Sequence, residues 1–228
     1  MTDALPDPPA SVPEGDALAA ALARAGLDQL WPFDVAWLGG ETRAALEVAC
    51  GTTVAGRALL VANSRALWPH LLRAVSDERA RTGSVAPHPL QRYVDAQLSR
   101  AIAARPGARA VASHDGPPYV PMQRIAAESG FGWPSPAHLI VHATLGPWVA
   151  LRAVIVGLGE AQLGARPEPA PCTHCDEGCA PAFEAARGSG DWRDWLAVRE
   201  ACPLGRTWRY SDAQSRYHYT KDLRALAE

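Results

Sequence analysis

The sequence has little excess charge of either sign. It carries 22 Lys and Arg residues against 24 Asp and Glu, which gives a formal net charge of −2 at pH 7, and its basic residues are spread along the chain. Domains that bind nucleic acids usually gather basic side chains into a patch or a stripe. We therefore expect no nucleic-acid partner.

Long hydrophobic runs are also missing. The apolar stretch VALRAVIVGLG at 149–159 is interrupted by Arg152 and is shorter than the about 20 residues that a membrane-spanning helix needs. The first residues, MTDALPDPPASVPEGD, lack the basic start and apolar core of a secretory signal. We expect no membrane partner and a cytoplasmic location, where cysteines serve as metal ligands or reactive thiols more often than as disulfides.

Motifs for phosphate binding and serine hydrolysis are absent as well. No G-x-G-x-x-G follows an expected strand, and neither a P-loop nor a G-x-S-x-G occurs. The sequence therefore gives no support to a nucleotide-phosphate function or to a hydrolase of that type.

Apolar periodicity predicts helices and strands in irregular alternation. Asp16 can cap a short amphipathic helix over 16–25, which Gly26 ends. Further helices are expected at 66–75, 89–104 and 122–129, and strands at 30–38, 57–62 and 108–113. The strand-like segments 137–143 and 148–157 flank a turn and predict an antiparallel hairpin.

These elements predict an α+β fold, with a mixed sheet flanked by helices, in a single domain over residues 16–228. Residues 1–15 are rich in proline and acidic side chains, so we expect them to form a disordered tail. Residues 168–206 hold four of the five cysteines and are expected to be a Cys-rich insertion in that domain.

The clustered cysteines are the strongest chemical signal. Cys172, Cys175 and Cys179 follow a C-x2-C-x3-C spacing, and Cys202 comes later with Pro203 directly behind it. Four thiolates are enough for one 4Fe–4S cluster or one structural zinc ion, but the spacing differs from the standard ferredoxin run.

Three interpretations of these cysteines stay open: a 4Fe–4S cluster, a zinc site, and ordinary free thiols. In a zinc site, His174 could replace one of the cysteines. Cys50 stands alone in an apolar context and is expected in the core.

Two arginines stand in contrasting contexts. Arg152 lies inside the apolar run VALRAVIV, so it needs an acidic partner or faces a pocket with an anionic ligand. An internal ion pair is the commoner of these two cases. Arg199, in the helix-like WRDWLAVRE, is by default a solvated surface charge.

Several separated segments together resemble a known family. They are WPFDVAW at 31–37, LGPWVALRAVIV at 145–156, DWRDW at 191–195 and RYSDAQSRYHYT at 209–220. In this order they resemble the CblC-type cobalamin-processing proteins, which are cyanocobalamin reductases and alkylcobalamin dealkylases. AESGFGW at 127–133 and CPLG at 202–205 are similar to the cobalamin- and iron–sulfur-dependent epoxyqueuosine reductases. Both families are similar to the nitroreductase fold.

The resemblance implies an enzyme that binds cobalamin with its lower base displaced and removes the upper axial ligand. Decyanation would be reductive and use a reduced flavin such as FMN, whereas dealkylation would use the glutathione thiolate as nucleophile. A 4Fe–4S cluster on the cysteines could supply electrons instead. The alternatives are an iron–sulfur reductase related to the epoxyqueuosine reductases and a non-catalytic corrinoid carrier. The sequence also leaves a homodimer open.

The resemblance also implies site residues. Arg152 and Arg199 match the family arginines that hold the glutathione carboxylates. The region around LGPW adds His142, Gly146 and Trp148 to the expected cofactor-binding set. Cys172, Cys175, Cys179 and Cys202 form the expected metal-binding set.

Overall fold

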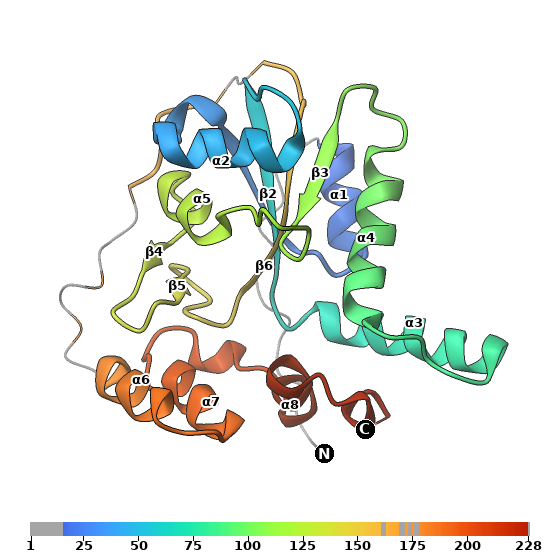
Figure 1. Cartoon of the computed structure of the whole chain (residues 1–228), viewed down its shortest axis with the longest axis vertical. Coiled ribbons are helices and arrows are strands. Elements are labelled where there is room, and N and C mark those ends of the chain that lie inside the picture. The colour runs from blue at the N-terminus through green and yellow to red at the C-terminus, as the bar shows by residue number, and fades with distance from the viewer. Residues whose placement is uncertain (1–15, 161–162, 169–171, 173–174, 176–177, 228) are drawn as a thin grey trace.

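The fold is built on a four-stranded sheet with helices on both faces (Figure 1). The structure is a computed structural model that describes residues 16–160, 163–168, 172, 175 and 178–227. The predicted tail, residues 1–15, lies outside the described residues. No described helix has the length and hydropathy to cross a membrane.

The main sheet has the strand order β1-β2-β6-β3. Its strands are β1 (Gln29–Asp34), β2 (Arg57–Asn63), β3 (Arg109–Ala112) and β6 (Ala150–Val156). All three pairings between them are antiparallel. Side chains alternate between the faces of β2, so Leu60 enters one apolar cluster while its neighbours Leu59 and Val61 enter the other.

Helices cover both faces of this sheet. The pair α1 (Ala17–Arg24) and α4 (Pro89–Ile102) packs on the face that carries Leu59, while α2 (Gly40–Cys50) and α5 (Met122–Glu128) pack on the opposite face (Figure 1). The Asp16 carboxylate caps α1 by accepting from the backbone N–H groups of residues 18 and 19. The remaining long helix, α3 (Leu67–Thr82), follows β2.

A group of C-terminal helices lies across one end of the sheet. It comprises α6 (Cys179–Arg187), α7 (Trp192–Glu200) and α8 (Asp212–Thr220) (Figure 1). Three short 3-10 helices, η1 (Val35–Trp37), η3 (Arg206–Trp208) and η4 (Leu223–Leu226), complete the helical elements named here. Cys179 is the first residue of α6, Arg199 lies in α7, and Cys202 follows α7.

The α+β fold with a sheet between helices is confirmed, but two expectations about strand pairing were wrong. The main-sheet strands pair antiparallel rather than in a mixed pattern. The predicted 137–157 hairpin does not form, because β2 and β3 occupy both edges of β6. The segment before the turn instead forms the short strand β5 (Ile140–Val141), which pairs with β4 (Trp133–Pro134).

Candidate functional site

Two arginines from distant parts of the chain meet below the sheet. Arg152 comes from β6 and Arg199 from α7, and the two guanidinium groups are close enough to affect each other electrostatically. Tyr210 lies near both of them, with its ring centre 5.8 Å from the Arg199 guanidinium carbon. The fold therefore concentrates positive charge in a largely buried place.

A neutral amide holds Arg152. Its Nε donates to Asn63 Oδ1 at 2.6 Å, at the end of the adjacent strand β2. The Asn63 amide in turn donates to the Ser64 carbonyl at 2.6 Å. The Ser64 hydroxyl donates to Asp28 Oδ2, also at 2.6 Å. This buried chain of hydrogen bonds orients the guanidinium without neutralising it.

Arg199 is buried, with 8% of its surface exposed, so its predicted place at the surface was wrong. Its Nη1 donates to the Pro147 carbonyl at 2.5 Å, and its Nη2 lies 3.3 Å from His218 Nε2. Its Nε has no hydrogen-bond partner. The helix buries this residue because α7 packs against the turn before β6 and against α8.

Neither guanidinium has a carboxylate partner among the ion pairs of the described residues. The internal ion pair that is the commoner case for an arginine like Arg152 is therefore not formed there. A buried cation without a counter-charge is costly, and an anionic ligand removes that cost.

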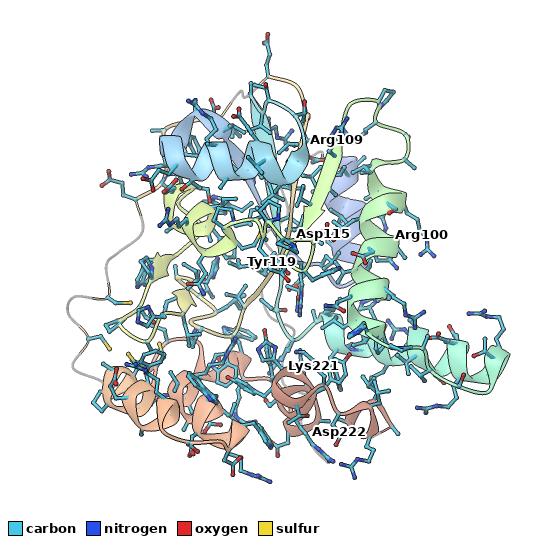
Figure 2. The ribbon with its side chains drawn as sticks, in the orientation of Figure 1. Arg100, Arg109, Asp115, Tyr119, Lys221 and Asp222 are labelled. Carbon is cyan, nitrogen blue, oxygen red and sulfur yellow. The ribbon has the colours of Figure 1, made fainter. Side chains whose placement is uncertain are left out.

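The buried arginines help to lower the pKa values of neighbouring basic side chains. Burial, with help from Arg199 and Arg152, holds the pKa of His218 well below its ordinary value. His218 is therefore neutral, and because a guanidinium only donates, its Nε2 accepts from Arg199. Burial and Arg152 also lower the pKa of Lys221, which follows α8 (Figure 2).

Arg152 reaches a cavity of about 350 Å³, which we call the arginine cavity. Its polar lining comprises His88, Gln91, Ser113, His114, Arg152, Tyr217 and Lys221. A small adjoining space of about 20 Å³ continues from Arg152 to Tyr210 and His218. The arginine cavity falls within the usual volume range of small-molecule sites.

A larger cavity, of about 410 Å³, lies between α3 and α4. Its lining residue Arg92 is already paired with Glu78 at 2.6 Å. Size alone would favour this cavity, but we place the candidate site at the arginine cavity because its buried charges lack carboxylate partners.

The four clustered cysteines line another cavity, of about 90 Å³, which we call the cysteine cavity. Burial is the main reason that the pKa of Cys172 and of Cys202 is raised, and the other cysteines of the cavity add to it. The thiols are therefore near one another. Among the residues described, no three His, Cys, Asp or Glu side chains already stand in an arrangement that could hold a metal ion. His174 lies outside the described residues.

The cysteine cavity lies close to Arg199. Pro147 and Val198 line this cavity. The Pro147 carbonyl accepts from Arg199, which directly follows Val198 in α7. The cysteine cavity and the arginine cavity share none of their described lining residues.

The other three residues of the expected cofactor-binding set are packed against neighbouring parts of the fold. His142 packs on Phe131 with ring centres 4.9 Å apart, and burial lowers its pKa. Trp148 is 1% exposed and packs edge-on against Tyr210. Gly146 has φ +57°, and a Cβ there would lie 2.1 Å from the Leu204 carbonyl oxygen. None of these three lines the arginine cavity.

The sequence analysis did not single out four residues of this site: Asn63, Tyr210, His218 and Lys221. Asn63 ends a buried apolar strand, where the sequence pattern gives no sign of a role in a site. In α8, Gln214, Tyr217 and His218 recur at i, i+3 and i+4, the spacing of one helix face. This spacing is the feature of the sequence from which the α8 residues of the site could have been predicted.

Comparisons with known proteins agree with the fold. No family model matches the chain, and no curated protein matches it in sequence. A solved structure, that of the C. elegans B12-trafficking protein CblC, a homologue of human MMACHC, matches with a TM-score of 0.67 and 16% identity. The match covers 92% of this chain and 96% of that one. The chain therefore shares its fold with the B12-trafficking protein CblC of C. elegans.

Proposed function

We propose that this chain binds cobalamin and processes the upper axial ligand of a corrinoid. The observation that carries the proposal is the pair of arginines, Arg152 and Arg199, which lack carboxylate partners among the described residues. Arg152 lines the arginine cavity, and Arg199 contacts His218, which lines the small adjoining space. Both arginines occur in a fold shared with a B12-trafficking protein. A cavity lined by a guanidinium, an ammonium and two hydroxyl groups suits a ligand that bears carboxylate, phosphate or amide oxygens.

The donors at this site fit such ligands. The Arg199 Nε and the Tyr210 hydroxyl are buried without a hydrogen-bond partner, so a ligand oxygen could satisfy them. Cobalamin, when bound, supplies the bond between cobalt and its upper ligand that the reaction breaks. The volume of the arginine cavity suits a tripeptide-sized thiol such as glutathione beside the corrinoid.

Different side chains have different roles in binding glutathione, the co-substrate. Arg152 and Arg199 each bind a carboxylate, and two fixed guanidinium groups orient a molecule that carries two carboxylates. The neutral His218 keeps Arg199 in place without adding positive charge. Reductive decyanation would need no thiol, and a reduced flavin such as FMN would then be the electron donor.

Titration with cyanocobalamin tests the corrinoid part of the proposal. The purified chain should shift the cobalt absorption spectrum to that of the form without its lower base and should retain corrinoid on gel filtration. An unchanged spectrum together with no retained corrinoid would refute the proposal.

Turnover separates an enzyme from a non-catalytic carrier. With methylcobalamin and glutathione, or with cyanocobalamin and reduced FMN, an enzyme should release the upper ligand faster than the same mixture without protein. Binding without any such acceleration would identify a corrinoid carrier.

The cysteine cavity favours one further candidate function, that of an iron–sulfur reductase. A cluster on these cysteines would lie beside Pro147, whose carbonyl accepts from Arg199. Such an enzyme would reduce its substrate with one-electron donors in place of glutathione. Reduction of cyanocobalamin by dithionite-reduced protein, without flavin or thiol, would support this candidate.

A further inference from the structure

The fold brings cysteines from three places in the chain to one cavity. Cys172 and Cys175 precede α6, Cys179 is its first residue, and Cys202 follows α7. The rest of the lining is almost wholly apolar. It comprises Ser135, Pro136, Ala137, Leu139, Val141, Pro147, Ala180 and Val198.

Core packing does not explain these thiols. A cysteine that only packs behaves as a small apolar side chain and is buried, as Cys50 is at 7% exposure. Cys175 is exposed, and Cys172, Cys179 and Cys202 are partly exposed. Their sulfur atoms border a space that a metal ion can enter from solvent.

We propose that Cys172, Cys175, Cys179 and Cys202 form a thiolate site for one thiophilic metal centre, either a zinc ion or a 4Fe–4S cluster. Both centres take four thiolates, and both tolerate an apolar lining that keeps water away. Binding replaces four S–H bonds with four S–metal bonds and releases four protons, so the oxidation state of sulfur does not change.

The thiols must move a short way to bind. Because no three potential ligands among the described residues are already arranged for a metal, the cysteine side chains turn about their Cα–Cβ bonds to converge. Coupling of this kind between metal binding and local ordering is common in thiolate sites. The centre would fasten the start of α6 to the end of α7.

Metal analysis of the full chain, purified without oxygen, tests the site. We expect about one zinc per chain, or a brown protein with about four iron and four sulfide. Cys175→Ala should lower the bound metal at least about fivefold, because it removes one of four ligands. Cys50→Ala, which alters the cysteine outside the cavity, should leave it unchanged. Metal-free wild type, or bound metal that Cys175→Ala does not change, would overturn the proposal.

A cobalt titration keeps the test decisive if a variant folds poorly. Apoprotein with intact far-UV circular dichroism should bind Co²⁺ with the near-UV absorption of a thiolate–cobalt bond, and the Cys175→Ala protein should show less of it. Absence of this absorption in the wild type would contradict the site. The spectral shift of cyanocobalamin is measured separately, so failure of either proposal leaves the other standing.

Discussion

At the scale of single residues, the choice of Asn63 explains why Arg152 is held by a hydrogen bond to a neutral amide and not by an ion pair. A carboxylate at this position would have formed the internal ion pair that the apolar strand makes the commoner case. The amide instead accepts from the guanidinium and leaves its charge intact. The residue that decides the chemistry of Arg152 is thus one strand away and uncharged.

Asn63→Asp tests this idea with almost no change in shape. The new carboxylate should neutralise Arg152 and weaken glutathione binding by about tenfold, or about 1.4 kcal/mol. Isothermal titration measures the affinity, and Gln123→Glu, on the exposed side of α5, makes the same change in net charge as a control. Equal affinities of the Asn63→Asp variant and the wild type would show that Arg152 does not hold a carboxylate.

At the scale of elements, the sequence predicted best where a structure is local. The N-cap of α1 and the four-residue repeat of apolar side chains along α4 are visible in the sequence, and both helices were placed almost correctly. The helix α2 was missed although Thr42, Leu46 and Cys50 also follow a four-residue repeat, because its apolar face is short.

Strand pairing and side-chain burial depend on residues far away in the sequence, and the predictions of both were wrong here. The 137–157 hairpin was excluded by strands β2 and β3, which occupy both edges of β6. Arg199 is buried by contacts to the Pro147 carbonyl and to Tyr210, which no local pattern in WRDWLAVRE reveals. The resemblance, in contrast, did point to both arginines, which the structure brings within electrostatic reach of each other, and their role as ligand-binding residues stays a prediction.

The end of α8 makes a pH-dependent contribution to stability. Asp222, labelled in Figure 2, caps η4 and pairs with Arg216 and Arg224, and hydrogen bonds from Arg224 hold its pKa well below 3.8. A depressed pKa in the folded state means that the contribution is complete above the unfolded value and declines as the pH falls below about 4.

Asp222→Asn should therefore lower the melting temperature at pH 7, and the difference from wild type should shrink between pH 4 and pH 2. Circular dichroism melts at several pH values measure it. Glu41→Gln removes the exposed Glu41–Arg124 pair and should change the melting temperature little at any pH. If the difference in melting temperature between Asp222→Asn and wild type does not change with pH, the ion pairs of Asp222 are not its cause.

At the scale of the whole molecule, two glycines allow a loop of the C-terminal helices to pack closely against the loop before β6. Gly146 and Gly205 both have positive φ, and a Cβ at either position would lie 2.1 Å from a backbone carbonyl oxygen of the other loop. The loops can approach this closely only without side chains. This contact lies beside Pro147, which lines the cysteine cavity.

Gly146→Ala should destabilise the chain by about 2–5 kcal/mol, because it adds a steric clash to the strain of a positive φ. Gly51→Ala is the matched control: it has φ +65° but no atom within 4 Å of the new Cβ, so only the strain remains, at about 1 kcal/mol. Urea unfolding compares the two, and equal losses would show that the close approach does not matter.

The position of Arg152 has a consequence for the order in which the site is made. Its strand is synthesised well before Tyr217 and Lys221, the residues that enclose the arginine cavity from α8 and beyond. The sheet strands all precede these residues in the chain, whereas the lining of the arginine cavity is complete only with the end of α8. We therefore expect the cavity to form after the sheet has paired.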